Sequence, residues 1–295
     1  MKADSLPRRL WRRLARAARD SLFIDQWTLM VADGDAIRTD FSGFRPLVPP
    51  PDRYWADPFV LEREGRSYVF VEEKLRAAGR GHIACLTLDS EGGIRDEQVV
   101  LQRPYHLSYP FVFEHQGETY MLPESAQNRT LDVYRCARFP GEWQYAGTLM
   151  RDVYLVDATL LEHAGRWWLF ANRKDPGGSS WDRLHLFHAD SPLSDRWTPH
   201  PRNPIVEDLR SARPAGRIFA HGGGLIRPSQ DCSRRYGYAL KFNRILTLDE
   251  REYSEQAEAA LVPPRAGRVI GTHTWNSAGG LTVIDALMRH ARFAS

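Results

Sequence analysis

Three stretches of this chain repeat one pattern: WADPFVLEREGRSYVFVE (residues 55–72), LSYPFVFEHQGETYMLPE (107–124) and LVDATLLEHAGRWWLFAN (155–172). In each copy a glutamate is followed three residues later by a glycine, and an aromatic residue stands three residues after that glycine. The copies start about 50 residues apart, a period typical of β-propeller blades. The pattern therefore predicts an all-β propeller, in which each repeat is one small sheet.

Each copy also indicates the order of strands inside a blade. The segment before the glycine predicts an inner strand, the glycine marks a tight hairpin, and alternating apolar and polar residues beyond it predict further strands. Two more divergent units follow, with inner hairpins expected over residues 222–242 and 270–285. We therefore expect five blades, the fifth completed by a strand at residues 23–31, because closing the ring with both termini removes an exposed edge.

The chain divides into a basic segment, residues 1–22, and the propeller, residues 23–295. The first segment predicts a short amphipathic helix, since Leu10 and Leu14 share one face and arginines cover the rest. Two interpretations stay open: residues 8–19 contact an anionic membrane surface, or the helix packs against the propeller as a solvated arm. Because no signal peptide and no spanning apolar run is present, we expect a cytoplasmic protein, at most peripheral to the inner membrane surface.

Several classes of function lack their sequence signatures. The three cysteines have no CxxC spacing, which argues against a disulfide framework and a zinc site, and Cys85 and Cys136 are expected in the core. No Walker loop, dinucleotide fingerprint, GxSxG elbow or HExxH helix occurs. Basic residues do not cluster beyond the N-terminus, so nucleic acid is not an expected partner. We expect neither a metal ion nor a cofactor.

The position that varies between the copies carries the expected chemistry. Asp57, Tyr109 and Asp157 occupy one repeat position at the start of the inner strand, which a propeller turns toward its axis. If the turn itself required aspartate, aspartate would recur in every copy, whereas the second copy has tyrosine.

Glu124 ends a second strand behind Pro123, which interrupts the hydrogen-bond ladder as expected at a pocket rim. Two carboxyl groups at an axial funnel fit glycoside cleavage, in which one protonates the leaving oxygen and the other activates water or attacks the sugar. The expected catalytic residues are Asp57, Asp157 and Glu124.

Other residues are candidates for binding the substrate. Arg213 and Arg217 form a compact cation pair that either clamps a carboxylate or phosphate or bridges neighbouring blades. His221 precedes three glycines, which permit close approach of a ligand. His273 is either a titratable site residue or a buried structural histidine. The full set of expected substrate-binding residues is Trp55, Glu72, Tyr109, Asn172, Arg173, Arg213, Arg217, His221, Arg227, Gln230, His273 and Trp275.

The chain resembles two known groups. ADPFV (56–60) with GRSYVFVEE (65–73), and HPRNPI (200–205), resemble the five-bladed propeller glycosidases of the arabinanase and invertase-like families. The segments DQWTLMV (25–31), SYPFVFEHQGETYMLPES (108–125) and RPSQDCSRRYGYALKFNRILTLDEREYSE (227–255) are similar to the N-terminal domain family of plant glucosamine inositolphosphorylceramide transferase and its bacterial relatives. This second resemblance covers roughly residues 20–288.

The resemblances imply roles for individual residues. In the glycosidases the first-blade aspartate is base or nucleophile, which matches Asp57, and Asp157 falls at the position of the third-blade acid. Tyr109 replaces the second-blade aspartate that orients the sugar ring. Our own inference, beyond the resemblance, is that Glu124 compensates for it from the strand end, and we expect Asp157 or Glu124 to be the acid. In the plant protein the transferase activity is associated with a separate C-terminal domain, which we do not expect in this chain. The resemblance therefore implies a carbohydrate-directed propeller more firmly than one reaction.

We expect a carbohydrate-active enzyme that cleaves or transfers a glycosyl unit of a carbohydrate or glycolipid at the axial pocket. The alternative is a non-catalytic glycan-binding module that serves a partner glycosyltransferase in envelope polysaccharide or glycolipid assembly. Two carboxyl groups about 5–10 Å apart across one pocket would favour the enzyme. Carboxyl groups neutralised by arginine in salt bridges would favour the binding module.

Overall fold

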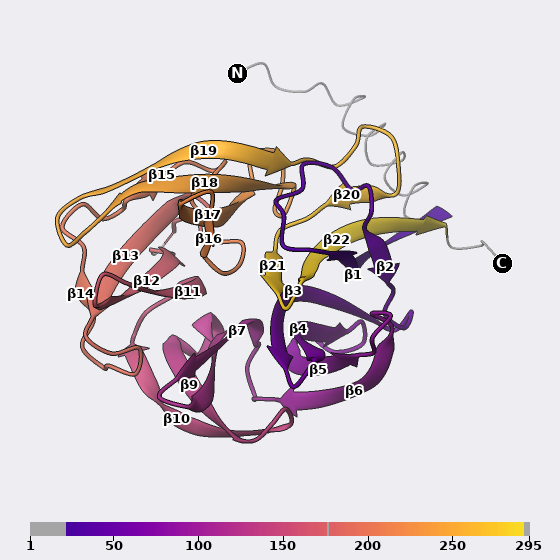
Figure 1. Ribbon diagram of the computed structural model, residues 1–295, viewed down its shortest axis with the longest axis horizontal. Helices are drawn as coiled ribbons and strands as arrows, with labels where there is room; N and C mark the ends of the chain where they lie inside the picture. Colours follow the sequence, from indigo (N-terminus) through magenta and orange to yellow (C-terminus); the bar gives the residue numbers. More distant parts are fainter. Residues whose placement is uncertain (1–21, 176, 292–295) are drawn as a thin grey trace.

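The described residues of the computed structural model, 22–175 and 177–291, form five antiparallel sheets arranged around a central axis (Figure 1). The predicted five-bladed β-propeller is confirmed. The predicted basic helix lies, apart from Leu22, outside the described residues. Within the described part, no helix is both long and apolar enough to cross a membrane.

The first three blades follow the repeats of the sequence. Blade 1 contains β3 (Arg53–Arg63), β4 (Arg66–Leu75), β5 (His82–Leu88) and β6 (Ile94–Leu101). Blade 2 contains β7 (Ser108–His115), β8 (Glu118–Glu124), the short 3-10 helix η1 (Ala126–Asn128), β9 (Thr130–Arg138) and β10 (Glu142–Arg151). Blade 3 contains β11 (Leu155–His163), β12 (Arg166–Arg173), β13 (Arg183–Ala189), β14 (Thr198–Pro199) and β15 (Val206–Glu207). Each blade is antiparallel, so consecutive strands are joined by short connections.

Blade 5 joins the two ends of the described chain. Blade 4 contains β16 (Phe219–His221), β17 (Gly224–Asp231), β18 (Ala239–Leu248) and β19 (Tyr253–Leu261), and blade 5 contains β20 (Val269–Gly271), β21 (Trp275–Ala278), β22 (Leu281–Ala291), β1 (Phe23–Asp33) and β2 (Arg45–Leu47). β1 pairs with β22 in continuous register from Phe23 opposite Ala291 to Asp33 opposite Leu281. The predicted closure of the fifth blade by the strand near the N-terminus is therefore confirmed.

The prediction for blade 4 was wrong by one strand, because the segment predicted as the inner strand is the second strand of the blade. The segment 224–231 is the second strand, and the inner position is filled by residues 213–221, whose backbone bonds to β17 through Ala215 N–H to Pro228 O (3.2 Å) and Gln230 N–H to Arg213 O (2.8 Å). This inner segment lacks an apolar alternation because the backbone passes close to blade 5. Gly216 has a φ of +127°, and a Cβ there would collide with the Trp275 carbonyl.

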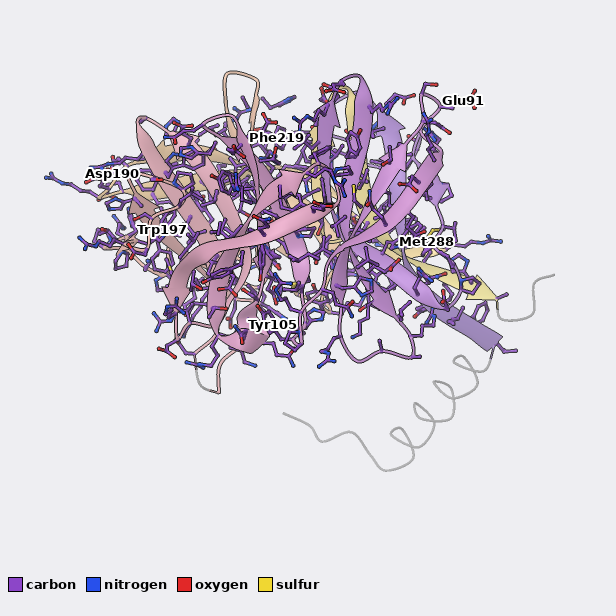
Figure 2. The ribbon with its side chains drawn as sticks, turned by 90° about the horizontal axis from the view of Figure 1, so that it is seen from below. Glu91, Tyr105, Asp190, Trp197, Phe219 and Met288 are labelled. Atoms are coloured by element: carbon purple, nitrogen blue, oxygen red, sulfur yellow. The ribbon has the colours of Figure 1, made fainter. Side chains whose placement is uncertain are left out.

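All five inner hairpins turn in the same way. The two central residues of each turn have positive φ, as a type I′ turn requires, and the second of them is always glycine. The central pairs are Glu64-Gly65, Gln116-Gly117, Ala164-Gly165, Gly222-Gly223 and Gly279-Gly280. The inner strands therefore begin on one face of the disc, here called the entry face, and turn back near the other. In Figure 2 Tyr105, just before β7, lies on one face, and Phe219, close to the inner turn of blade 4, lies toward the opposite one.

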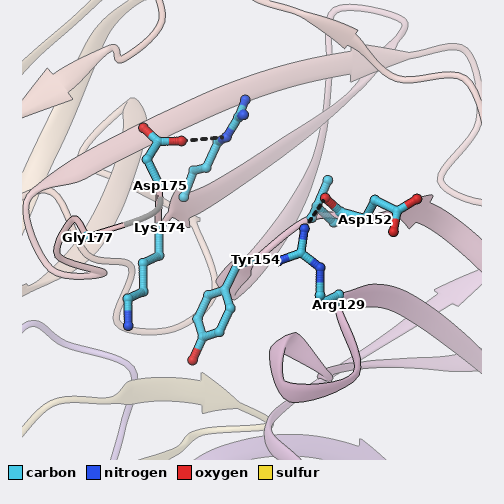
Figure 3. Close-up of a pocket in the computed structure, with 8 residues that line it drawn as sticks. Arg129, Asp152, Tyr154, Lys174, Asp175 and Gly177 are labelled. Carbon is cyan, nitrogen blue, oxygen red and sulfur yellow. Dashed lines mark hydrogen bonds and ion pairs between the residues drawn. The ribbon is translucent and has the colours of Figure 1, made fainter.

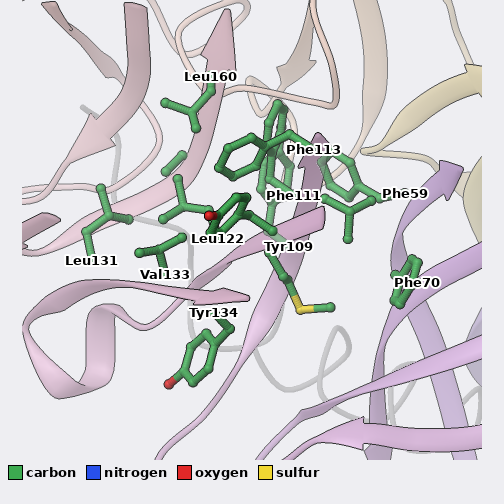
Figure 4. Packing of buried hydrophobic residues seen from close by; sticks show 14 of the residues in the cluster. Phe59, Phe70, Tyr109, Phe111, Phe113, Leu122, Leu131, Val133, Tyr134 and Leu160 are labelled. Atoms are coloured by element: carbon green, nitrogen blue, oxygen red, sulfur yellow. The ribbon is translucent and has the colours of Figure 1, made fainter. Parts of the chain in front are cut away.

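Aromatic packing between blades fills the space around the axis. Tyr109 is fully buried and packs edge-on against Phe59 of blade 1, with ring centroids 4.8 Å apart, and Phe59 also contacts Phe111 (5.4 Å). Figure 4 shows these rings together at the junction of blades 1 and 2. Cys85 and Cys136 are buried and free, as predicted. The candidate site lies at the axis toward the entry face, where the inner strands of blades 1 to 3 begin.

Candidate functional site at the propeller axis

The variable repeat position has an unusual backbone. Asp57, Tyr109 and Asp157 all have positive φ, of 52°, 43° and 54°, and each stands where the pairing between the inner and second strands shifts register. Such a bulge re-aims a side chain, and the left-handed conformation costs energy in a residue other than glycine. At these three equivalent positions, all facing the axis, backbone strain is therefore accepted in order to orient the side chain.

Asp57 is held by donors from two neighbouring blades. Its Oδ1 accepts a hydrogen bond from the Thr274 hydroxyl (2.9 Å), and its Oδ2 accepts one from the Tyr109 backbone N–H (3.2 Å). The Nδ1 of His273 lies 3.6 Å from Oδ1. Burial, more than any other cause, raises the pKa of Asp57 to about 6, although His273 opposes the shift. The carboxyl group is thus oriented without an arginine or lysine partner.

Asp285 fixes the junction between blades 5 and 1. Its Oδ1 accepts hydrogen bonds from the backbone N–H groups of His273 (2.8 Å) and Thr274 (3.0 Å). Its Oδ2 accepts one from the N–H of Asp57 (3.0 Å) and lies 2.5 Å from His273 Nδ1. Burial alone would lower the pKa of His273, but the Asp285 carboxylate raises it to about 9. His273 is therefore a cation at neutral pH, stacked on Trp27 at 4.2 Å.

Glu72 is the second carboxyl group on the Asp57 side. It lies on β4 opposite Ala56, next to the register shift that contains Asp57, and its Oε1 lies 3.5 Å from both the Tyr54 hydroxyl and His106 Nε2. Burial, followed by the negative charge of Asp57, raises its pKa to about 8. The two pKa values thus lie on opposite sides of neutrality. At pH 7 the ionised form is favoured for Asp57 and the protonated form for Glu72.

Asp157 is held in a different way. Arg213 donates to both of its oxygens, from Nε to Oδ2 (2.6 Å) and from Nη2 to Oδ1 (3.3 Å), and the Gln230 amide donates to Oδ2 as well (3.0 Å). Asp157 and Arg213 are both buried, with 2% and 8% of their side chains exposed. Such a forked pair is geometrically specific, and it occupies the oxygens that an acid would need for a substrate. Asp157 therefore holds Arg213 in place.

Glu124 lies on the Asp157 side of the axis. Its Oε2 accepts a hydrogen bond from the Asp157 backbone N–H (3.3 Å) and is 3.9 Å from Arg213 Nη2. Burial, and then the charge of Asp157, raise the pKa of Glu124 well above its usual value. Tyr109 stands between the two sides, and its hydroxyl accepts from the Gly216 N–H (2.7 Å) and bonds Thr159 Oγ1 (2.8 Å).

A second repeat position completes the ring around the axis. Glu72, Glu124, Asn172 and Gln230 each stand seven residues after the turn glycine of their blade (72 − 65, 124 − 117, 172 − 165 and 230 − 223). Asn172 is fully buried, its Nδ2 donates to Ser180 O (3.1 Å), and its Oδ1 has no hydrogen-bond partner among the described residues. We call the axial cluster the set Asp57, Glu72, Glu124, Asp157, Asn172, Arg213, Gln230, His273 and Asp285.

Six of the expected substrate-binding residues lie apart from this cluster, and the last of them, Arg217, is described with Arg213 below. Trp55 is a core residue that donates to Glu73 (2.9 Å), and Trp275 packs against Phe219 at 4.4 Å. Arg227 is buried in a forked pair with Glu255 inside blade 4. The other two lie at opposite ends of the inner strands: His221 is exposed beside the turn far from the entry face, and Arg173 is exposed at the rim.

The expected arginine clamp is not free to bind an anion. Arg213 is paired with Asp157, as described above. Arg217 donates to the Val112 carbonyl (2.5 Å) and lies over the Phe111 ring at 4.9 Å, so that it bridges blades 4 and 2. Burial lowers its pKa to about 10. Of the two interpretations given to this pair, the geometry favours the structural bridge between blades.

Several residues of the site were missed by the sequence analysis. Asp285 stands five residues, not seven, after its turn glycine (285 − 280), so it does not fall on the repeat position shared by Glu72 and Glu124. Tyr236 was missed because its loop carries no repeat signal; its ring contacts Arg213 at 4.9 Å and His273 at 5.2 Å. Trp181 lies 5.9 Å from Tyr236 and is 36% exposed. These rings link the axial cluster to solvent.

One group of potential metal ligands occurs among the described residues. The ligand atoms of Asp57, His273 and Asp285 lie within 4.8 Å of one another, and all three side chains are buried. Their contacts already satisfy one another, because His273 Nδ1 is 2.5 Å from Asp285 and the Asp57 oxygens accept from Thr274 and Tyr109. The group therefore forms a charge network between blades, and the expectation of no metal ion stays a prediction.

Solved structures share this fold at low sequence identity. A family 117 glycoside hydrolase from the marine bacterium Zobellia galactanivorans is similar with a TM-score of 0.58 and 12% identity, covering 89% of this chain and 90% of that one. The β-xylosidase RS223 is similar with a TM-score of 0.59 and 11% identity, covering 82% and 93% of the two chains. At these identities the likeness establishes the propeller fold alone.

Sequence relatives are closer. Glucosamine inositolphosphorylceramide transferase 1 of Arabidopsis thaliana is 34% identical over 231 residues, which is 77% of this chain and 29% of the plant protein. The protein of the same name from Oryza sativa subsp. japonica is 36% identical over 209 residues, 70% of this chain and 28% of the relative. This chain thus spans less than a third of the curated relatives it matches. Residues 48–283 match the family model described as "Glucosamine inositolphosphorylceramide transferase 1, N-terminal", and the chain belongs to that family.

Proposed function

We propose that the axial cluster cleaves or transfers a glycosyl unit, with Asp57 as base or nucleophile and Glu72 as acid. The observation that carries the proposal is that two buried carboxyl groups lie on adjacent strands of blade 1, with Glu72 opposite the residue before Asp57, and that burial raises their pKa values to about 6 for Asp57 and about 8 for Glu72. At neutral pH such a pair supplies one carboxylate and one carboxylic acid, the combination that glycoside cleavage requires.

The choice of Glu72 over the other carboxyl groups follows from their contacts. Asp157 is engaged by Arg213 and Gln230 on both oxygens, and Glu124 accepts from the Asp157 backbone and faces Arg213. Glu72 has only two long contacts, each 3.5 Å, so its proton is the most available to a substrate. The role first expected for Asp157 and Glu124 therefore passes to Glu72 in this proposal.

Recognition of the sugar fits the aromatic pair at the edge of the cluster. Trp181 exposes 36% of its surface beside Tyr236, and Tyr236 contacts Arg213 and His273 of the cluster. Sites that bind small ligands combine aromatic faces with a few oriented polar groups. The family is named after a glucosamine inositolphosphorylceramide transferase, and the similar solved structures are a glycoside hydrolase and a β-xylosidase. These names support a carbohydrate or glycolipid substrate.

The second candidate is a glycan-binding module that serves a glycosyltransferase. The forked Asp157–Arg213 pair favours it, because neutralised carboxyl groups suit binding rather than proton transfer. The match to the N-terminal region of much longer relatives is also compatible with a partner catalytic region. The two candidates share the axial site and differ in whether bonds are broken there.

Sugar-release and glycan-array assays on the wild type and on Asp57→Asn test the proposal. We expect the variant to lose glycan turnover by about 10²–10⁴-fold while it keeps binding, since it removes proton transfer and preserves the shape of the side chain. Binding by the wild type without turnover on any ligand of the array would favour the module. Turnover by the wild type that is unchanged in Asp57→Asn would refute the catalytic assignment of Asp57.

A further inference from the structure

A cavity opens beside the axial cluster, between blades 2 and 3. Its volume is about 300 Å³. It is lined by Arg129, Asp152, Val153, Tyr154, Arg173, Lys174, Asp175 and Gly177 (Figure 3). None of these residues except Arg173 was expected to bind a ligand.

The cavity adjoins the axial cluster through the inner hairpin of blade 3. Tyr154 stands three residues before Asp157, and Lys174 stands two residues after Asn172. The Lys174 N–H donates to the Tyr154 carbonyl (3.0 Å), which extends the hairpin beyond the ends of β11 and β12. A ligand in this cavity would therefore be a neighbour of whatever occupies the axial cluster.

Positive charge in the cavity exceeds negative charge. Three cations, Arg129, Arg173 and Lys174, line the cavity with two acids, Asp152 and Asp175. Asp175 is shared by two arginines, Arg173 at 3.2 Å and Arg183 at 3.8 Å. In contrast, Arg129 and Lys174 have no carboxylate within ion-pair distance among the described residues: Arg129 donates to the Asp152 carbonyl (3.0 Å), and Lys174 Nζ lies over the Tyr154 ring at 5.3 Å. Two cations with spare donors thus flank one tyrosine (Figure 3).

The rim is shaped by two strained residues. Arg129 and Asp152 have φ values of 59° and 56°, and the strain is held by the bond from the Val153 N–H to the Arg129 carbonyl (3.2 Å) together with the Arg129–Asp152 contact. Left-handed residues other than glycine concentrate at sites where side chains must be aimed. The strain here sets the position of the Arg129 guanidinium relative to Lys174.

We propose that this cavity binds the phosphate group of a phosphorylated glycan or glycolipid whose sugar occupies the axial cluster. The Arg129 guanidinium and the Lys174 ammonium have hydrogen-bond donors left over, and these suit the oxygens of a doubly charged phosphate group. The Tyr154 hydroxyl is a further donor. The inference deepens the proposed function by naming an anionic class of substrate, and it rests on residues outside the catalytic pair.

Calorimetric titration of the full chain with glucose 1-phosphate, glucose and inorganic phosphate tests the subsite. We expect glucose 1-phosphate to bind more tightly than glucose, and Lys174→Gln or Arg129→Gln to weaken its binding about tenfold or more, because each removes a charge-assisted hydrogen bond. Lys174→Arg should restore most of the affinity. Arg135→Gln is the matched control, since Arg135 is an exposed arginine paired with Glu118 on the outer part of blade 2.

Flotation with phosphatidylcholine vesicles, with and without phosphatidylglycerol, distinguishes a lipid phosphate from a soluble one. Loss of vesicle binding in Lys174→Gln would place the phosphate on a lipid, and loss of glucose 1-phosphate binding alone would place it on a soluble sugar; both support the subsite. Equal binding of glucose and glucose 1-phosphate, or equal affinity in all variants, would overturn it. Asp57→Asn should keep phosphate binding, so failure of the catalytic proposal and failure of this one are separable.

Discussion

Asp57 and Asp157 occupy the same repeat position, have the same left-handed backbone and are equally buried, yet their surroundings are opposite. Asp157 is held by a guanidinium and an amide that come from blade 4. Asp57 is held by a hydroxyl and a backbone N–H, and its nearest cation, His273, bonds Asp285 instead. The repeat thus sets where a carboxyl group points, and the neighbouring blade decides whether it is neutralised or kept for chemistry.

The largest effect is expected from removing the partner of Asp157. Arg213→Met leaves a buried carboxylate without its cation and should lower the free energy of unfolding by about 3–5 kcal/mol. Urea denaturation of this variant beside Arg210→Met measures the difference, because Arg210 is exposed and pairs only with Asp208. A loss below about 1 kcal/mol would mean that the pair is not a structural support, and the contrast with Asp57 would fail.

The next effect concerns the pH dependence of turnover. Activity requires Asp57 ionised and Glu72 protonated, so kcat/KM should rise through about pH 6 and fall through about pH 8. Glu72→Gln should lower kcat about 10²-fold and remove the alkaline limb, whereas Glu124→Gln should leave both limbs in place. If the alkaline limb of the pH profile disappeared only in Glu124→Gln, the general acid would have to be Glu124, on the Asp157 side of the axis, and not Glu72.

The smallest effect is expected at the aromatic edge. Trp181→Ala should weaken glycan binding about tenfold and leave kcat nearly unchanged, and Trp181→Phe should recover part of the affinity. Tyr145→Ala is a suitable control, because Tyr145 is an exposed aromatic residue on β10, at 54% exposure. The affinity is measured as Kd on the same glycan. A loss of affinity in Tyr145→Ala comparable to that in Trp181→Ala would show that the effect does not come from stacking beside the axial cluster.

The architecture could be predicted because it depends on local patterns. Turn glycines at a fixed distance from a glutamate and strands of alternating polarity recur in blades 1 to 3, and the closing strand needed only an apolar segment near the N-terminus. Blade 4 was misplaced by one strand because its inner segment contains Pro214, which bridges Ser229 within the blade, and Gly216, which lies against the Trp275 carbonyl of blade 5, so the apolar alternation is broken.

The site could be predicted only in part, because its chemistry depends on contacts between distant blades. The repeat located Asp57, Asp157, Glu72 and Glu124 at the axis. It gave no sign that Arg213, 56 residues from Asp157, would neutralise that group, or that Asp285 would bond the Asp57 backbone across 228 residues. Trp55 and Trp275 were assigned to the ligand on residue type, whereas their positions in the strand turn them into the core.

The comparison of the two aspartates is tested most directly by the free energy of unfolding of Asp57→Asn and Asp157→Asn at pH 7.5. The pKa of Asp57 in the folded chain is about 6, above its ordinary value of 3.8, so the folded state loses stability as pH rises through this range. Asparagine can keep the bond from the Tyr109 N–H and donate to the Thr274 hydroxyl, so Asp57→Asn should gain about 1–3 kcal/mol while it loses turnover.

Asp157→Asn should instead lose about 3–5 kcal/mol, because Arg213 stays buried without its forked partner and keeps only the more distant Glu124 carboxyl, at 3.9 Å. Equilibrium urea denaturation of the two variants beside the wild type gives both numbers in one experiment. Changes of opposite sign are the predicted result. Destabilisation of similar size in both variants would contradict the account, since it would show that Asp57 and Asp157 are two copies of the same structural support.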